Sequence, residues 1–254
     1  GSITLSLDTD FDGCMKIVQE ITADNTIYLA NSMNSLRIEG QKTVSIDIVQ
    51  QFDWEVPDWI VIPGRNLLNV SALGKGFLLM RDLGIISRLP RIACVQSANA
   101  NPLFRSFRKD FEEFEPVTAK RTAASAIQIG NPVSRNKAIR TLREFNGVVE
   151  DADEQEMAEA CAFADRTGLF TCPHTGVALA GTIKLAKKGT ISKEDKIVVI
   201  STAHGLKFTD FKLKYHKDEL NEVRAKHTNL PVELPPDTDK VRDALEERLK
   251  GFEK

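Results

Sequence analysis

The sequence predicts an α/β fold of three layers, in which helices cover both faces of a mostly parallel sheet. Apolar segments of about five residues recur between longer segments with helical spacing, a pattern typical of a parallel sheet covered by helices. The chain has 254 residues, 42% of them hydrophobic and 28% charged, so it is long enough to bury a large core. No apolar run approaches the roughly 20 residues that a bilayer-spanning helix needs.

Charge and cysteine content narrow the function classes. The 34 Lys and Arg residues are balanced by 36 Asp and Glu residues, which gives a net charge of -2. Because the basic residues form no stripe, nucleic acid is not an expected partner. The opening Gly1-Ser2 resembles a scar left by cloning, with no leader behind it. The four cysteines form no Cys-x-x-Cys pair and are expected to be reduced thiols without a structural metal. We therefore expect a soluble intracellular protein that binds a small molecule or another protein and does not associate with membranes.

The first predicted unit is a strand, a helix and a second strand. The short apolar segments 3–7 and 26–29 are expected to be strands. Between them a helix is expected to begin at Asp12, with Met15 and Ile21 on its apolar face. This arrangement would form one βαβ unit.

The second predicted unit contains a strand that is buried on both faces. Apolar residues at four-residue steps predict a helix over 37–52. The uninterrupted apolar run 59–62 predicts the buried strand. A helix over 67–82, a strand over 91–95 and a loop of turn-forming residues over 97–102 are expected to follow.

Residues 105–129 are charged and aromatic with weak periodicity, so no element is assigned there. Helices are expected at 135–145, 154–167 and 176–187, strands at 148–149 and 196–200, an extended proline-rich linker at 230–236 and a terminal helix at 241–252. The strand at 196–200 is the clearest of these elements. Small hydrogen-bonding residues follow it at 201–205, which suits a strand end that faces a ligand.

The first candidate site is the segment 63–69, where a strand end enters a helix. Exposed N–H groups in this geometry can hold a phosphate. A phosphate loop usually needs several glycines, whereas here Gly64 stands alone and Arg65 and Leu68 are bulky. On these residues alone, an ordinary turn is the favoured interpretation.

Two further candidates lie near the end of the chain. The Thr202 hydroxyl could bond a ring nitrogen of a ligand and His204 could exchange protons, although a structural histidine explains the position equally well. In the segment Cys172-Pro173-His174-Thr175-Gly176, a helix start capped by Thr175 is favoured over a Cys–His catalytic pair, which would need a third orienting group.

The acidic segment 8–12 resembles the beginning of a calcium loop. The Gly and Glu that such a loop requires do not follow at the expected offsets. A helix start is therefore favoured, because carboxylates stabilise the positive end of the helix dipole, and no metal site is expected.

Eight ordered segments, spread over most of the chain, carry a resemblance to a known family. They are DTDFDGCM at 8–15, IYLANS at 27–32, LRIEGQKT at 36–43, QFDWEVPDW at 51–59, ANANPL at 98–103, ASAIQIG at 124–130, CPHTGVA at 172–178 and STAHGLKF at 201–208. In these segments the sequence resembles the plant-type threonine synthases.

The resemblance implies a fold and a chemistry. The family consists of pyridoxal-phosphate lyases of fold type II that convert O-phosphohomoserine and water to threonine and phosphate, usually as homodimers. In plants they lie in the plastid and are activated by S-adenosylmethionine. The implied architecture is the three-layer large domain seen in tryptophan synthase β-like enzymes. The expected division is a small-domain remnant at 1–36, the large α/β domain at 37–229 and a linker with a helix at 230–254.

The resemblance covers only the carboxyl-terminal portion of the family, and it departs from the family pattern in two ways. The lysine that forms the Schiff base with the cofactor has no counterpart here, because Lys207 matches a different family segment. Where the family reads Pro-Gly-Gly-Asn-Leu-Gly-Asn, this chain reads PGRNLLN at 63–69. We expect Arg65 and Leu68 to fill the space of the phosphate and to strain the backbone where positive φ is needed. The Arg65 guanidinium could instead pair with a phosphate.

The expected site residues follow from the resemblance. The vestigial cofactor-binding residues would be Gly64, Arg65, Asn66, Leu67, Leu68, Asn69 and Thr202, the last matching the partner of the pyridine nitrogen. The substrate-pocket candidates are Asn99, Gln128 and His204. No catalytic residue and no metal ligand is expected, and pyridoxal phosphate is not expected to be bound.

The preferred hypothesis is a catalytically inactive, truncated homologue that acts through protein interaction. A shortened fold should uncover apolar surface, which self-association or a full-length threonine synthase would cover. The alternative is a threonine synthase represented by a fragment or completed by a partner chain. A third, weaker hypothesis is a sensor that binds a phosphorylated or carboxylated metabolite through Arg65, Thr202 and Asn99. An empty, partly collapsed cleft is preferred to it. The plastid is the implied location, with the cytoplasm as the alternative for the shortened chain.

Overall fold

A four-stranded parallel sheet forms the centre of the computed structural model, which describes residues 1–24 and 26–250. The strand order is β3-β2-β1-β4. The strands are β1 (Trp59–Pro63), β2 (Arg91–Ser97), β3 (Val148–Ala152) and β4 (Ile197–Val199). The strands predicted at 59–62, 91–95, 148–149 and 196–200 are therefore all present, because continuous apolar runs are the mark of strands buried on both faces.

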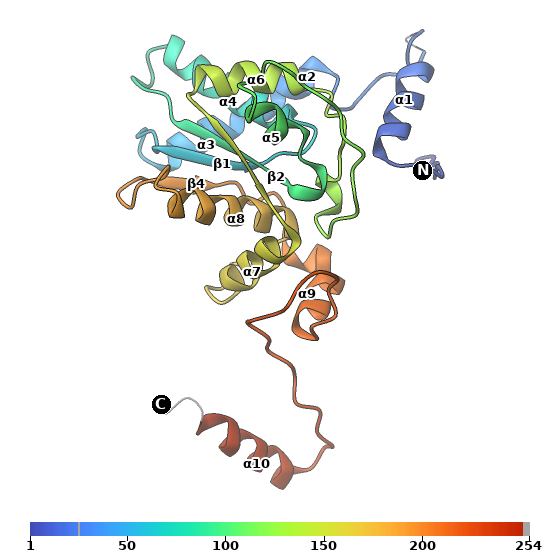
Figure 1. The fold of residues 1–254 in the computed structure, drawn as a ribbon, viewed down its shortest axis with the longest axis vertical. Helices are drawn as coiled ribbons and strands as arrows, with labels where there is room; N and C mark the ends of the chain where they lie inside the picture. The colour runs from blue at the N-terminus through green and yellow to red at the C-terminus, as the bar shows by residue number, and fades with distance from the viewer. Residues whose placement is uncertain (25, 251–254) are drawn as a thin grey trace.

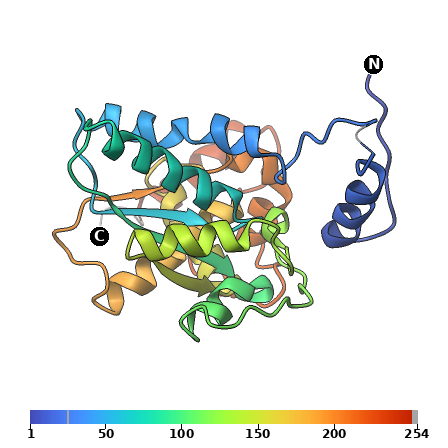
Figure 2. The ribbon, with the colours of Figure 1, turned by 90° about the horizontal axis from the view of Figure 1, so that it is seen from above.

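Helices cover both faces of this sheet, as Figures 1 and 2 show. Successive residues of a strand face opposite sides, so Trp59 and Val61 of β1 lie in one core cluster and Ile60 and Ile62 in the other. The first face is covered by α8 (Pro173–Lys187), on which α7 (Glu154–Asp165) packs, and the second by α3 (Thr43–Gln51), α4 (Leu68–Asp82) and α6 (Arg135–Glu144). The predicted three-layer α/β fold is confirmed.

The helix predicted over 37–52 is wrong as a single element. The structure has α2 (Ser35–Gln41) and α3, with Lys42 between them. The Thr43 hydroxyl donates to the carbonyl oxygen of Gly40 at 3.0 Å, a local bond that competes with regular helix. Both helices pack against α4, so the break lets each of them contact the same neighbour.

The strands predicted at 3–7 and 26–29 are also wrong. Both segments are irregular and exposed, and only α1 (Phe11–Ile21) forms between them. Asp10 rather than Asp12 is its N-cap, accepting a hydrogen bond from the Gly13 amide at 2.8 Å. A strand needs a neighbouring strand to bond its backbone groups. In the described part of the chain, neither segment belongs to the sheet.

Helix α1 stands to one side of the sheet domain and is tied to it by a hydrogen bond (Figures 1 and 2). The Asp12 carboxylate accepts from the Gly130 amide at 3.2 Å. Burial raises the pKa of Asp12, and the bond from Gly130 opposes this shift without reversing it. Only Met15 among the α1 residues is buried, so most of the predicted apolar face of this helix is open.

The segment between β2 and α6 is mostly irregular backbone. It begins with η1 (Ala98–Ala100) and α5 (Pro102–Phe107) and contains η2 (Ser125–Ile127). The Val117 amide donates to the Gly130 carbonyl at 3.0 Å. A Cβ on Gly130 would lie 1.9 Å from the Val117 carbonyl oxygen, so this close pairing of backbones requires glycine.

The chain ends in helices that surround or leave the domain. The helices η3 (Gly205–Phe208) and α9 (Thr209–His216) follow β4 and had no counterpart in the sequence prediction. The linker at 230–236 contains no helix, and α10 (Thr238–Leu249) buries none of its residues and lies apart from the sheet in Figure 1. The predicted end of this helix at Phe252 lies outside the described residues. Within 1–24 and 26–250, every helix is too short or too polar to cross a bilayer.

Candidate functional site

The carboxyl ends of the four parallel strands bring most of the predicted site residues to one edge of the sheet. Val61 of β1 pairs with Val199 of β4. Gly64 and Thr202 each lie three residues beyond this pair, so they occupy neighbouring loops of strands about 4.8 Å apart. Asn99 follows β2 at the same edge. The edge is where open α/β sheets hold ligands.

Gly64 allows the loop after β1 to turn against the neighbouring strand. Its amide donates to the Val95 carbonyl at 2.6 Å, and a Cβ at this position would lie 2.7 Å from the Cys94 sulfur. The requirement for glycine is thus close approach rather than positive φ. The Asn69 side-chain amide donates to the Pro63 carbonyl at 2.9 Å, which closes the loop.

Asn66 leaves one buried donor without a partner in this loop. Its Oδ1 accepts from the Val133 amide at 2.7 Å, and its carbonyl accepts from the Ser134 amide at 3.2 Å. Its Nδ2 has no hydrogen-bond partner among the described atoms, although the residue is only 4% exposed. Leaving a buried donor unsatisfied costs about 1–3 kcal/mol. A bound acceptor would remove that cost.

The expected strain lies one residue away from where the sequence placed it. Leu67, not Arg65 or Leu68, has positive φ, at 64°. This conformation costs a residue with a side chain about 1–2 kcal/mol. Leu68 packs in a small core cluster with Ile38 and Ala72, so it contributes to the contact with α2 rather than standing free at the start of α4. The exposed Arg65 donates through Nε to the Ala126 carbonyl at 2.9 Å.

These residues fit the phosphate end of the implied cofactor. Helix α4 has 15 residues and no side-chain cap from the residue that precedes it. The Val70 amide donates to the Asn69 side chain at 3.0 Å, so the N–H groups of Leu68 and Asn69 are the ones available to an anion. The unpaired Nδ2 of Asn66 lies in the same loop. Arg65 adds a positive charge nearby. Gly64 and Asn69 therefore hold the shape of a phosphate site, since the Gly64 backbone amide and the Asn69 side-chain amide already have partners. The donors to the phosphate would be the Asn66 side-chain amide and the backbone N–H groups of Leu68 and Asn69.

Thr202 belongs to a cluster of hydroxyl and thiol groups at the start of α8. Its amide donates to the Thr175 hydroxyl at 3.3 Å, and its own hydroxyl lies 3.8 Å from the Cys172 sulfur. The Thr175 hydroxyl also lies 3.3 Å from that of Ser201. Thr202 is exposed, so its hydroxyl is open to a ring nitrogen as the resemblance implies.

The segment 172–176 is a helix start, as predicted, but its cap is Cys172 rather than Thr175. The Cys172 sulfur accepts from the Thr175 amide at 3.4 Å. His174 is buried, and its Nε2 accepts from the Ala126 amide at 3.0 Å. This bond to backbone occupies the nitrogen that a general base would use. The segment thus forms the start of α8 and anchors η2 to it.

The environment of Cys172 changes its acidity. Burial favours the neutral thiol, but hydrogen bonds from His174 and from the side chain and amide of Thr175 favour the thiolate more strongly and lower the pKa to about 6. By contrast, burial raises the pKa of the Cys94 thiol to about 12.

The lowered pKa of Cys172 predicts how the free energy of unfolding depends on pH. A thiol whose folded pKa is lowered contributes stability that is absent below about pH 6, grows as pH rises and is complete above its unfolded pKa of roughly 8.5. In urea denaturation, the gap in unfolding free energy between wild type and Cys172→Ala should widen by on the order of 1 kcal/mol from pH 6 to pH 8.5, after allowance for solvent screening. Cys94→Ala is the control: because the folded pKa of Cys94 is raised, its gap should not widen over this range and should narrow slightly near pH 8.5. Parallel curves for both variants would contradict the lowered pKa.

The three substrate-pocket candidates are not brought together. His204 is exposed and caps η3, its Nδ1 accepting from the Leu206 amide at 3.2 Å. Asn99 and Gln128 line a cavity of about 800 Å³. His204, Thr202 and the loop at 64–69 do not line this cavity. The candidates thus divide between two places on the carboxyl side of the sheet.

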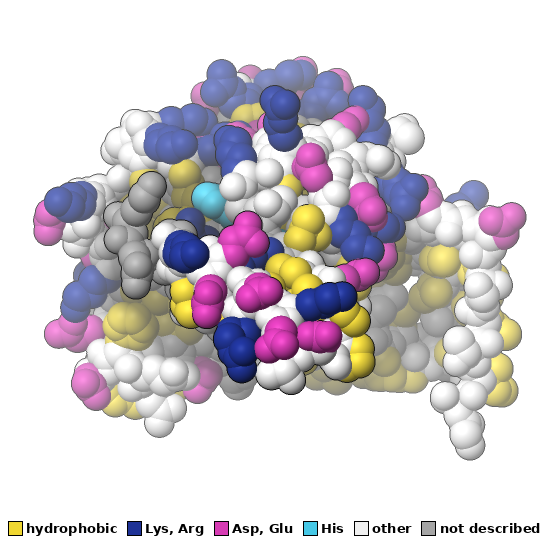
Figure 3. Space-filling view, turned by 90° about the horizontal axis from the view of Figure 1, so that it is seen from below, with side chains coloured by type: hydrophobic (Ala, Val, Ile, Leu, Met, Phe, Trp, Pro, Cys, Tyr) yellow, Lys and Arg dark blue, Asp and Glu magenta, His cyan; other side chains and the backbone are white. Residues whose placement is uncertain are grey.

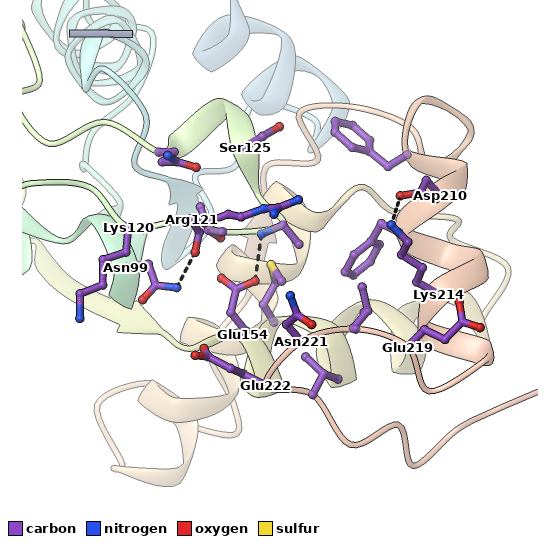
Figure 4. A pocket seen from close by; sticks show the side chains of 18 of the residues that line it. Asn99, Lys120, Arg121, Ser125, Glu154, Asp210, Lys214, Glu219, Asn221 and Glu222 are labelled. Carbon is purple, nitrogen blue, oxygen red and sulfur yellow. Dashed lines mark hydrogen bonds and ion pairs between the residues drawn. The ribbon is translucent and has the colours of Figure 1, made fainter. Parts of the chain in front are cut away.

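Sequence reasoning missed this cavity, which we call the side pocket. Its walls come from the segment 120–128, from α7 and from the chain between η3 and Val223. Figure 4 shows the labelled residues arranged around the hollow. The adjacent Lys120 and Arg121 were a signal in the sequence, together with the segment 207–211, in which two phenylalanines alternate with polar residues. No metal-binding group of three or more His, Cys, Asp or Glu side chains is present within 1–24 and 26–250.

A family model described as "Pyridoxal-phosphate dependent enzyme" matches residues 1–203. The chain is 52% identical to "Threonine synthase 2, chloroplastic" of Arabidopsis thaliana, over all of this chain and 49% of that protein. It is 35% identical to the threonine synthase of Methanocaldococcus jannaschii, over 87% of this chain and 55% of that protein. The chain therefore spans about half the length of these relatives.

Solved structures agree with the fold. The threonine synthase of Escherichia coli superposes with a TM-score of 0.68 and 20% identity, over 96% of this chain and 58% of that one. Maize serine racemase superposes with a TM-score of 0.59 and 14% identity. At such identities the likeness concerns the fold alone, which is that of fold type II enzymes.

Proposed function

This chain belongs to the pyridoxal-phosphate dependent enzyme family, and from that premise we propose that it is a threonine-synthase-like pseudoenzyme, inactive by itself, that binds a threonine synthase chain. Threonine synthases at 52% and 35% identity are among the proteins that this chain resembles. The single observation that carries the interaction role is the open apolar surface of the N-terminal segment, defined here as residues 1–24 and 26–33.

The proposed inactivity agrees with the state of Lys184, a lysine near the carboxyl edge of the sheet. Pyridoxal phosphate supplies an electron sink, and enzymes of this kind attach it through a neutral lysine amine. Lys184, near the carboxyl edge of the sheet, donates to the Asp151 carbonyl at 2.8 Å and to Glu156 at 3.1 Å. Burial alone would lower its pKa, but the bond to Glu156 and the nearby carboxylates raise it. Lys184 is thus held as a cation that cannot act as a nucleophile.

The N-terminal segment exposes more large apolar side chains than a free surface normally carries. Ile3 is 90% exposed, Leu5 79% and Tyr28 70%, and apolar atoms line this part of the molecule at the right edge of Figure 3. Ile17 and Ile21 of α1 are also exposed. Patches of this kind usually mark an interface.

A threonine synthase chain is the occupant that the comparisons favour. The family model includes the N-terminal segment, so in relatives the matching residues belong to the same folded unit as the sheet. The relatives are about twice as long as this chain. The surface to be covered is therefore of the kind that the rest of such an enzyme would bury.

Mixing with the chloroplastic threonine synthase 2 of Arabidopsis tests the interaction. We expect the wild-type chain to elute with the synthase in size-exclusion chromatography with light scattering. Ile17→Lys combined with Ile21→Lys should elute separately, because two charges would have to be buried in the interface. Leu83→Lys, at an exposed apolar position on the sheet domain, is the control and should still bind. Separate elution of the wild type, or self-association that excludes the synthase, would overturn the interaction proposal.

The catalytic half of the proposal has its own readout. Incubated with pyridoxal phosphate and O-phosphohomoserine, the purified chain should release no threonine. After borohydride reduction, mass spectrometry should find the cofactor on none of its lysines. Threonine release by the chain alone would contradict the proposal.

A second candidate function is a threonine synthase completed by another chain. The uncapped start of α4 and the unpaired Nδ2 of Asn66 favour it, because both are kept in the form that a phosphate needs. Threonine production by the mixture above the rate of the synthase alone would support this candidate. An unchanged rate would leave the pseudoenzyme proposal standing.

A plastid location is part of the same proposal. Its support is the chloroplastic relative, at 52% identity. A fluorescent fusion of the naturally encoded protein should accumulate in plastids, and signal confined to the cytosol would contradict this location.

A further inference from the structure

We propose that the side pocket binds a free α-amino acid with an apolar or aromatic side chain. This inference stands apart from the proposed function, because it concerns a cavity that the cofactor loop does not line. It rests on an arginine without a partner, on acidic side chains around it and on an apolar wall.

Arg121 provides the binding group for a carboxylate. No hydrogen bond or ion pair of its guanidinium occurs in the described part of the chain, whereas its carbonyl accepts from Asn99 at 2.8 Å. Figure 4 shows its side chain extending into the hollow and Lys120 pointing away from it. The Lys120 amide donates to the Asn99 carbonyl at 2.8 Å. These two bonds fix the backbone that carries Arg121. Its side chain is exposed at the pocket, and a guanidinium can bind a carboxylate through two parallel bonds.

The charges of the lining favour a zwitterion over a phosphate. The pocket is lined by four basic side chains, Lys120, Arg121, Lys207 and Lys214, and by four acidic ones, Glu154, Asp210, Glu219 and Glu222. Lys214 is paired with Asp210 at 2.8 Å. A multiply charged anion would meet as many carboxylates as cations here.

Glu154 is the acceptor best placed for an ammonium group. Its Oε2 accepts from the Ala123 amide at 2.9 Å, which anchors the carboxylate and leaves Oε1 without a bond among the described atoms. Glu154 comes from α7 and lies beside the segment that carries Arg121 (Figure 4). A ligand between them would meet a cation and an anion, as an amino acid requires.

The rest of the pocket is apolar and held in place. Met157, Phe208, Phe211, Leu220 and Val223 line it. Gln155 fixes the far wall by accepting from the Arg224 amide at 2.7 Å and donating to its carbonyl at 3.0 Å. Two or three convergent polar groups over an apolar wall are typical of small-molecule sites. The volume of about 800 Å³ accommodates an aromatic side chain.

Calorimetric titration of the whole chain with L-phenylalanine tests the proposal. We expect saturable binding that Arg121→Gln weakens at least tenfold and that Lys120→Gln, the matched neighbour, changes less than twofold. N-acetyl-L-phenylalanine lacks the ammonium group and L-phenylalaninamide lacks the carboxylate, so both should bind at least tenfold more weakly. Glu154→Gln retains an acceptor for the Ala123 amide and should discriminate less between L-phenylalanine and its N-acetyl form.

Three results would overturn this inference. The first is no binding of L-phenylalanine or L-leucine by the folded wild type. The second is equal loss in the Lys120→Gln and Arg121→Gln variants. The third is tighter binding of inorganic phosphate than of L-phenylalanine. The titration needs no partner chain and no cofactor, so its failure would not affect the proposed function. Failure of the interaction and activity tests would likewise not affect this inference.

Discussion

Trp59→Ala is expected to lower the free energy of unfolding by about 3–5 kcal/mol, the usual cost of truncating a large buried aromatic side chain. Trp59 begins the central strand β1 and is only 2% exposed. Its Nε1 donates to Asp195 at 3.0 Å, and the Arg91 guanidinium lies 4.1 Å from the centre of its ring. Alanine would leave a cavity, one hydrogen bond fewer to Asp195 and a cation without its aromatic partner.

Urea denaturation followed by circular dichroism would measure this loss. The chain has two tryptophans, and the other one, Trp54, is 48% exposed. Trp54→Ala is therefore the matched control and should cost less than about 1 kcal/mol, as exposed positions usually do. Trp59→Phe should fall between the two, since it keeps much of the apolar volume but loses the bond to Asp195. Similar losses for Trp59→Ala and Trp54→Ala would contradict the central place of β1 in the core.

The strands and the layers of the sheet could be predicted because their signal is local. A run such as 59–62 is apolar on both faces wherever it folds, and only the middle of a covered sheet satisfies it. The segments 3–7 and 26–29 are equally apolar in part, yet they do not pair. A strand depends on a neighbour that may lie far away in sequence or in another chain, and local composition carries no record of it.

The details of the sites depended on tertiary contacts and could not be predicted. Leu67 is a good helix former in sequence terms, but the turn between Gly64 and α4 forces it to positive φ. Leu68 replaces a family glycine and was expected to obstruct the phosphate, whereas a contact with Ile38 places it in a core cluster. The side pocket joins residues about 100 positions apart, from Arg121 to Val223, and no periodic pattern marks such a site.

Asn66→Asp is expected to weaken the binding of inorganic phosphate or pyridoxal phosphate to the start of α4 at least about 100-fold. Aspartate keeps the Oδ1 that accepts from the Val133 amide and replaces the unpaired Nδ2 by a second oxygen. A carboxylate about 4 Å from a phosphate charge, at an effective dielectric constant of about 20, is repelled by about 4 kcal/mol. The fold should tolerate the change, because a negative charge near a helix N-terminus is stabilised by the dipole.

Phosphorus NMR titration would measure binding to the chain alone and to its mixture with a threonine synthase. Asn131→Asp is the control, since Asn131 is exposed and its Oδ1 already accepts from Arg135 at 2.8 Å; it should change the affinity less than twofold. Phosphate binding that is lost in Asn66→Asp would mean that α4 has kept an anion site in spite of Arg65 and Leu68. Both candidate functions allow this outcome, because neither requires the loop to be blocked. Equal affinities of Asn66→Asp and wild type would instead mean that the anion binds away from α4. The loop at 64–69 would then no longer be a phosphate site, as the pseudoenzyme proposal allows.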